Sequence, residues 1–265
     1  MKFRFGRKLI NNTDMRSLAL KGLDLQKKSV LEIGPLDRPI VQRGMAKEVF
    51  YLDHCSTDDL RQKYASEPHV DKSRIAEVDF VSNDGRLTPS LFPRKFDVVV
   101  ASHVIEHVPN LVGWLADIAD VLSSGGHLAL VVPDCRFTFD KFRRPTPRHW
   151  IAEAHFNDAR RPELQNVIDH FSNVAHINAN DVWQKKDVTE ARRIHSTGDV
   201  ASAIQQWHAG AYLDCHSWVF TRDTFPSLID WLTSNYHIPL VLSEISGPVY
   251  GQLEFYVQLK RSTTS

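Results

Sequence analysis

The chain has 265 residues, of which 42% are hydrophobic and 24% charged, and 32 Lys and Arg residues balance 32 Asp and Glu residues. This apolar content is enough for one α/β domain, and zero net charge gives no overall field that would select nucleic acid or an anionic membrane. No run approaches the roughly 18 apolar residues that span a bilayer. The start of the sequence lacks the apolar stretch of a secretory signal, and three widely spaced cysteines favour reduced thiols, so we expect a cytoplasmic protein.

A basic extension over residues 1–27, which we expect to be solvated, precedes five short β-branched or aliphatic runs. Near-continuous apolarity of this kind is typical of strands in a parallel sheet that helices cover on both faces. Helical periodicity separates the runs, most clearly over 111–122, where Gly125 and Gly126 are expected to end the helix. The five expected strands are residues 29–34, 48–53, 75–80, 96–102 and 127–133.

The second half of the chain follows another pattern. Residues 135–215 contain no convincing buried strand but many Arg, His and aromatic residues, and we expect an ordered, largely helical insert folded over the carboxyl edge of the sheet. Thr224 and Pro226 predict a helix over 224–235. Residues 240–246 and 252–260 then predict an antiparallel hairpin.

These elements predict an α/β fold. We expect a Rossmann-like doubly wound sheet, mostly parallel, with a C-terminal antiparallel hairpin and a helical insert after strand five. Ligands of such sheets bind outside the carboxyl ends of the strands. We expect a single domain made of the extension 1–27, a cofactor-binding core 28–134, a substrate-lid insert 135–215, and a closing helix and hairpin 216–265.

Five motifs follow one another along the first half of the chain: LEIGP, YLDH, EVDF, FDVVVASHVIEHVPN and LSSGGHLALVVPD. In this order they resemble the motifs of class I S-adenosylmethionine-dependent methyltransferases, in particular the broad small-molecule (type 11) group typified by ubiquinone-pathway enzymes. The resemblance covers residues 28–135 closely and HSWVFTRDTFPSLIDWL with the terminal hairpin loosely. It implies S-adenosylmethionine as the cofactor and methyl transfer to another molecule as the activity.

The expected strand ends carry the residues that such a cofactor would require. Gly34 would let the backbone approach the ligand, Asp53 would accept from the ribose hydroxyls, and Asp79 would accept from the adenine amino group beside Phe80. Backbone carbonyls of Ser102 and His103 would hold the ammonium group. The full set of expected cofactor-binding residues is Glu32, Gly34, Pro35, Arg38, Asp53, His54, Asp79, Phe80, Ser102 and His103.

The first loop departs from the family pattern G-x-G-x-G. Only Gly34 is present, and Pro35 and Pro39 stiffen the loop and remove two backbone donors. Arg38 would supply positive charge for the cofactor carboxylate. The alternative is a non-catalytic binding module with a degenerate cofactor loop.

The acceptor is expected to lie beyond strand five, where aromatic and basic residues alternate. Arg136, Phe139, Arg143 and Arg144 are the candidate substrate-binding residues, and they favour a polar small molecule, such as a sugar or glycan intermediate, methylated on oxygen or nitrogen. An oxygen acceptor needs a general base. The candidates are His103, Asp140, Asp134 and His216.

Two other enzyme classes fit parts of the sequence. His103, Glu106 and His107 match the H-x-x-E-H pattern of zinc hydrolases, but the preceding strand and Pro109 favour a turn over the required helix. A nicotinamide oxidoreductase would share the acidic residue after strand two but lacks the G-x-G-x-x-G fingerprint. The histidines between 149 and 216 have no i, i+4 pairs, so the sequence predicts no metal site.

Overall fold

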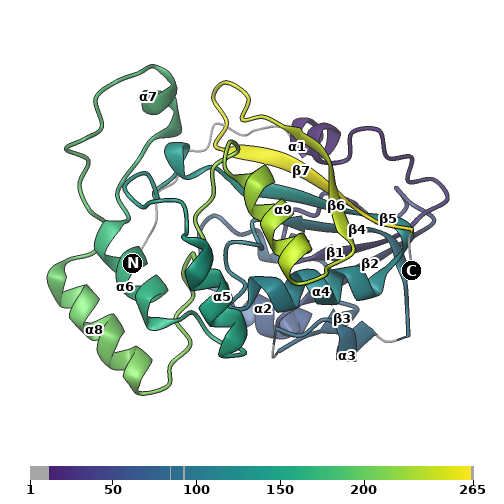
Figure 1. Ribbon diagram of the computed structural model, residues 1–265, viewed down its shortest axis with the longest axis horizontal. Helices are drawn as coiled ribbons and strands as arrows, with labels where there is room; N and C mark the ends of the chain where they lie inside the picture. Colours follow the sequence, from purple (N-terminus) through teal and green to yellow (C-terminus); the bar gives the residue numbers. More distant parts are fainter. Residues whose placement is uncertain (1–11, 84, 92, 264–265) are drawn as a thin grey trace.

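A computed structural model describes residues 12–83, 85–91 and 93–263. One twisted sheet forms the centre of the molecule, and helices pack on it (Figure 1). The sheet contains seven strands in the order β3-β2-β1-β4-β5-β7-β6. Part of the basic extension, residues 1–11, lies outside the described residues.

The first five strands are parallel. They are β1 (Ser29–Ile33), β2 (Glu48–Asp53), β3 (Phe80–Val81), β4 (Phe96–Ser102) and β5 (Leu122–Pro133). β1 pairs with both β2 and β4, so the strand order reverses there and the carboxyl ends of β1 and β4 flank the place where ligands of such sheets bind. Alternate β4 residues enter opposite cores: Val99 and Ala101 on one face, Val98 and Val100 on the other.

Helices cover both faces, as the apolar strands require. The α3 (Thr88–Leu91), α4 (Leu111–Val121) and α9 (Phe225–Asn235) helices contribute to one core, and α1 (Asn12–Ala19) contributes to the other. The α4 helix begins at Asn110, whose side chain accepts the amide of Gly113, and its residues Leu111, Leu115 and Ile118 are fully buried. The α2 helix (Thr57–Lys63) and a short 3₁₀ turn, η1 (Lys72–Arg74), lie between β2 and β3.

The hairpin β6 (Leu240–Ser246) and β7 (Glu254–Arg261) completes the sheet, with β7 antiparallel to β5. The predicted fold class is therefore confirmed, including the closing hairpin and the helix that precedes it. That helix begins after Thr224, which provides no side-chain cap.

The insert after β5 is helical, as predicted. It contains η2 (Cys135–Phe137), α5 (Arg148–Phe156), α6 (Leu164–Asn173), α7 (Ala179–Trp183) and α8 (Thr197–His208), and it lies at the end of the sheet where β5 leaves (Figure 1). Its two ends meet, because Asp134 pairs with Phe220 in a parallel bridge and the amide of Cys135 donates to the Phe220 carbonyl. A chain that leaves β5 and returns to it holds the insert over the carboxyl edge.

Two predicted strand ranges were wrong. The strand expected over 75–80 is limited to Phe80–Val81, which pairs with β2 alone. The strand expected over 127–133 begins at Leu122, directly after α4, and Gly125 and Gly126 lie inside it. Gly125 has a φ of +72° within the irregular part of the β4/β5 pairing. A left-handed glycine serves a helix end and a β-bulge equally well, so the Gly-Gly pair alone cannot distinguish them.

Candidate active site at the carboxyl edge of the sheet

Gly34 begins the loop after β1 with a φ of +64°, a conformation that glycine adopts without strain. Its amide donates to the Leu52 carbonyl at 2.8 Å. A Cβ built at Gly34 would lie 3.2 Å from Cγ2 of Val104, so the loop packs tightly against the turn after β4. The close approach of these two segments marks the switch point of the sheet.

Glu32 holds the loop that follows Gly34. Its buried carboxylate accepts the amides of Ile40 at 2.7 Å and Val41 at 2.8 Å. Burial raises the pKa of Glu32 to about 7, although both amide hydrogen bonds act in the opposite direction. Since both carboxylate oxygens accept backbone amides of the loop that follows Gly34, Glu32 fixes the conformation of this loop.

The other residues of this loop differ in exposure. Pro35 is buried, whereas Arg38 is exposed. The Arg38 guanidinium lies 3.4 Å from the Asp37 carboxylate and donates to the His69 carbonyl at 3.4 Å. It therefore has partners of its own, with which a cofactor carboxylate would have to share it.

Asp53 ends β2 at the carboxyl edge and is buried. Within the described part of the chain, the Asp53 carboxylate is hydrogen-bonded to the His54 amide at 2.7 Å and to His54 Nδ1 at 2.6 Å, both through Oδ1. Lys63 Nζ lies 2.8 Å from Nε2 of the same ring. This arrangement leaves Oδ2 of Asp53 for a further donor such as a hydroxyl.

The structure does not bring Asp79 to the same edge. Its amide donates to the Tyr51 carbonyl, two residues before Asp53, and its carboxylate accepts the Tyr51 amide at 2.7 Å and binds Arg43 at 2.8 Å. Phe80 is half-buried and its ring lies beside that of Phe50, on the side of α3 and α4. Both positions follow from the shifted strand: the carboxyl end of β3 is Val81.

The turn after β4 carries a strained residue. Ser102 is half-buried, and His103 has a φ of +54°. Nε2 of His103 lies 3.2 Å from Glu254 and its Nδ1 lies 3.5 Å from Glu106. Burial lowers the pKa of His103, but the two carboxylates outweigh it and raise the pKa to about 10. A ring held in this way is protonated at neutral pH and cannot accept a proton from an acceptor.

Residues 103–107 form a turn with no helical segment, as the sequence predicted for this motif. The geometry of a zinc peptidase, two histidines on one helical face, is therefore absent from this described segment. Instead the turn contacts the chain that returns from the insert: the amides of Ser217 and Trp218 donate to the Glu106 carbonyl at 2.8 and 3.1 Å.

That contact places His216 beside Glu106. Asp140 accepts Nδ1 of His216 at 2.6 Å, and its other oxygen accepts from Arg143 at 2.8 Å. Burial would raise the pKa of Asp140, but His216 and Arg143 together hold it well below its usual range. His107 similarly gives its Nδ1 to Asp214 at 2.9 Å. We call Glu106, His107, Asp140, Asp214 and His216 the edge cluster.

Asp134 has no capacity left for a substrate proton. Its buried carboxylate accepts from the backbone amides of Arg136 and Arg222 and from the Arg136 guanidinium at 2.7 and 2.8 Å. Arg136 also binds Asp223. The pair joins the start of the insert to the start of α9, which is a structural task.

The remaining candidates of the insert divide by exposure. Arg143 is buried between Asp140 and Asp169, so it is not open to an anionic ligand. Phe139 is half-buried against the rings of His170 and His216. Arg144 is exposed. Of the predicted arginines, Arg144 is the one whose side chain solvent reaches most freely.

Sequence reasoning missed the acidic partners of these residues. Asp169, Asp214 and Glu254 are far from their partners in the chain, and no local pattern indicates the pairings. The Asp-Cys-His run at 214–216 and the H-x-x-E-H motif were the available signals, since both place histidines next to carboxylates.

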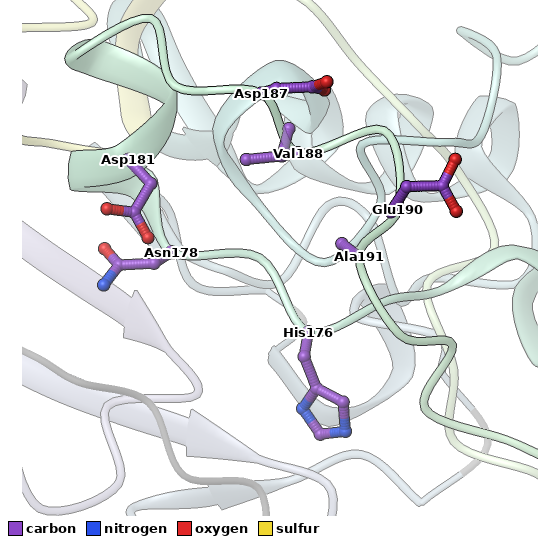
Figure 2. A pocket seen from close by; sticks show the side chains of 7 residues that line it. All are labelled: His176, Asn178, Asp181, Asp187, Val188, Glu190 and Ala191. Atoms are coloured by element: carbon purple, nitrogen blue, oxygen red, sulfur yellow. The ribbon is translucent and has the colours of Figure 1, made fainter.

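A separate hollow lies within the insert, away from the strand ends (Figure 2). Two of its acidic groups are engaged locally: Asp187 accepts from Thr189, and Asp181 pairs with Lys186. This hollow contains none of the predicted site residues, and its lining consists of His176, Asn178, Asp181, Asp187, Val188, Glu190 and Ala191.

A family model described as a methyltransferase domain matches residues 9–230. The chain belongs to this methyltransferase family. No curated protein has a matching sequence. The match agrees with the resemblance read from the five motifs, and it makes a nicotinamide oxidoreductase or a zinc hydrolase the poorer interpretation.

Solved structures share the fold of this methyltransferase at low sequence identity. A candidate zinc-dependent alcohol dehydrogenase from Rhodobacter sphaeroides is 14% identical with a TM-score of 0.51, covering 93% of this chain and 88% of that chain. An S-adenosylmethionine-dependent methyltransferase from Mesorhizobium loti is 13% identical with a TM-score of 0.47, covering 95% and 100%. Magnesium protoporphyrin IX methyltransferase from Synechocystis, with bound S-adenosylmethionine, is 8% identical with a TM-score of 0.43, covering 95% and 78%. The first of these three has a TM-score above 0.5, and from it we take the fold alone.

Among the helices of the described residues, none has the length and apolarity that crossing a membrane would require.

Proposed function

We propose that this methyltransferase transfers the methyl group of S-adenosylmethionine to an oxygen or nitrogen atom of a polar small molecule, such as a sugar or glycan intermediate. The supporting observation is the proximity of two features: the glycine loop of the switch point packs on the β4 turn, and that turn carries Glu106 and His107 of the edge cluster. A donor held by the first would therefore lie beside polar groups that receive an acceptor.

The residues present fit S-adenosylmethionine. Gly34 leaves room where a side chain would collide with Val104, and Asp53 directs a buried carboxylate to the edge of the sheet. Glu32 fixes the loop between them. In this proposal Asp53 binds the ribose hydroxyls, His54 and Lys63 orient Asp53, and the carbonyls of Ser102 and His103 receive the ammonium group.

When bound, the cofactor supplies an activated methyl group on a sulfonium, so the protein contributes mainly alignment and a water-poor site. The insert provides the water-poor site by covering the carboxyl edge of the sheet. In this proposal a group of the edge cluster takes the proton that the acceptor loses. Of the four base candidates, His216 keeps a ring nitrogen, Nε2, that its Asp140 hydrogen bond does not occupy.

The test of the cofactor site is Asp53→Ala, compared with Asp58→Ala on the exposed surface of α2. Loss of charge-assisted hydrogen bonds of about 1.5–3 kcal/mol lowers S-adenosylmethionine affinity by roughly 10- to 150-fold. Calorimetry should show this loss for Asp53→Ala and unchanged affinity for Asp58→Ala, whose side chain is 91% exposed. Equal affinities in the two variants would remove Asp53 from the site.

A further inference from the structure

Three side chains of metal-binding type meet in the edge cluster: Glu106, His107 and His216. One ligand atom of each lies within 4.8 Å of those of the other two. The two imidazole rings stand at 85° with centroids 4.7 Å apart, and His216 Nε2 is 3.9 Å from Glu106 Oε1. Ligand atoms around one divalent ion lie roughly 3–3.5 Å apart at bond lengths near 2.1 Å. Small side-chain rotations would therefore bring all three to one ion.

The carboxylate of Glu106 gives an independent reason to expect a cation. It is fully buried, and neither oxygen has a hydrogen-bond partner among the described residues. The nearest charged atom is Nδ1 of His103 at 3.5 Å, and the other nitrogen of that ring is directed at Glu254. A buried carboxylate without hydrogen bonds is costly, and an imidazolium at 3.5 Å that is shared with Glu254 offsets only part of this cost.

Both histidines are oriented as metal ligands usually are. Asp140 holds Nδ1 of His216 and Asp214 holds Nδ1 of His107, which leaves Nε2 of each ring for another partner. A carboxylate on one ring nitrogen fixes the tautomer and orients the other nitrogen toward a metal. Two such histidine–carboxylate pairs converge on Glu106, an arrangement that an ordinary polar network does not require.

From these contacts we infer that Glu106, His107 and His216 form a binding site for a divalent transition-metal ion, such as zinc. Two imidazoles and one carboxylate suit this class of ion and leave coordination positions open. This site is new relative to the sequence prediction, which expected no metal and weighed the His103, Glu106 and His107 motif and the histidines between 149 and 216 separately.

The site has a closed side and an open side. Glu106 and His216 are buried, whereas the side chains of His107 and Asp214 are 34% and 61% exposed. An ion can therefore enter past His107 and reach a carboxylate shielded from water, as a built metal site requires.

The catalytic role of the ion rests on the proposed function, whereas metal binding itself does not. With its Nε2 bound to the ion, His216 would no longer be the base, and an acceptor hydroxyl at an open position would lose its proton to solvent instead. Its oxygen then forms the new bond to the methyl carbon while the S–CH₃ bond breaks and its electron pair stays on sulfur.

The experiment titrates the metal-free full chain with Zn²⁺ by calorimetry and with Co²⁺ by visible absorption. The variants are His216→Ala, Glu106→Gln and Asp214→Asn, and the control is His149→Ala, an exposed histidine of α5. We expect one ion per chain in the wild type and in His149→Ala. Loss of a partner carboxylate costs roughly 10- to 100-fold in affinity, so Asp214→Asn should fall in this range and the two ligand variants should lose at least as much.

Thermal melting and S-adenosylmethionine affinity of each metal-free variant show whether it is folded. Because Asp214 is exposed, Asp214→Asn keeps the test decisive even where a buried variant does not fold. A folded wild type that binds neither metal stoichiometrically overturns the inference, as does unchanged metal affinity in His216→Ala or Asp214→Asn. A wild type that binds S-adenosylmethionine but does not bind added metal would overturn this inference alone, and one that binds metal but not S-adenosylmethionine would overturn the proposed function alone.

Discussion

Single residues at the carboxyl edge combine charge and burial, and Glu32 shows the consequence for stability most clearly. Burial raises its pKa from the ordinary 4.5 to about 7. Between these pH values the folded chain keeps a proton that the unfolded chain has lost. The free energy of unfolding therefore falls as pH rises through this window, and Glu32 adds no further change above it.

We predict that this effect disappears in Glu32→Gln, which does not titrate. At 1.36 kcal/mol per pKa unit, the stability of the wild type relative to Glu32→Gln should fall by roughly 3 kcal/mol between pH 4.5 and pH 7. Denaturant unfolding at several pH values measures it. A stability difference that stays constant over this range would show that the carboxylate is ionised in the fold.

At the residue scale, the sequence predicted correctly which segments surround the edge but not which partners each side chain has. Asp53 and Gly34 are where their strand ends were expected. Arg143 was expected to clamp an anion, yet Asp140 and Asp169 enclose it. Asp169 lies 26 residues away, on a helix whose position depends on tertiary packing, so no local pattern could indicate the pair.

Because Arg143 is enclosed in this way, its substitution should affect stability differently from that of its neighbour Arg144. Removing one partner of a buried charge network leaves uncompensated charge, so Arg143→Ala should lower the free energy of unfolding by about 3–5 kcal/mol. Arg144 is exposed, and Arg144→Ala should change it by less than about 0.5 kcal/mol. Denaturant unfolding of both variants gives the comparison, and similar losses of stability would contradict the buried network.

Arg144 also bears on the acceptor. If the insert determines which acceptor binds, Arg144→Ala should weaken the binding of an anionic acceptor about tenfold, since a charge-assisted hydrogen bond of about 1.5 kcal/mol is lost. Cofactor affinity should stay within about twofold, because the proposed cofactor residues lie elsewhere. Binding measurements with each ligand test this separation, and a parallel loss of both affinities would contradict it.

At the scale of elements, the order and type of the strands follow from the sequence because parallel strands buried on both faces need apolar runs. The exceptions have physical causes. β3 pairs only with β2, so its ladder is short and its sequence carries a weak signal. β5 begins earlier than predicted, because Gly125 forms an irregularity within the strand instead of ending the preceding helix. Glycine is common at both kinds of position, so the sequence pattern does not distinguish them.

At the scale of the whole molecule, the candidate site is built from two segments separated by about 110 residues. The turn after β4 and the segment at 216–218 meet because backbone amides of the latter donate to Glu106. The two ends of the insert between them are joined beside β5 by the contacts of Asp134 and Cys135 with Phe220. The sequence predicted the insert and its place, and the edge cluster could be recognised only once this closure was known.

The central claim is that the switch point between β1 and β4 binds the methyl donor and the edge cluster receives the acceptor. A crystal structure of the chain with S-adenosylhomocysteine tests it most directly. We expect the ribose at Asp53, the homocysteine part beside Gly34, and the sulfur directed toward Glu106 and His216. A ligand bound in the insert hollow, or at the edge with its sulfur directed away from the cluster, would contradict it.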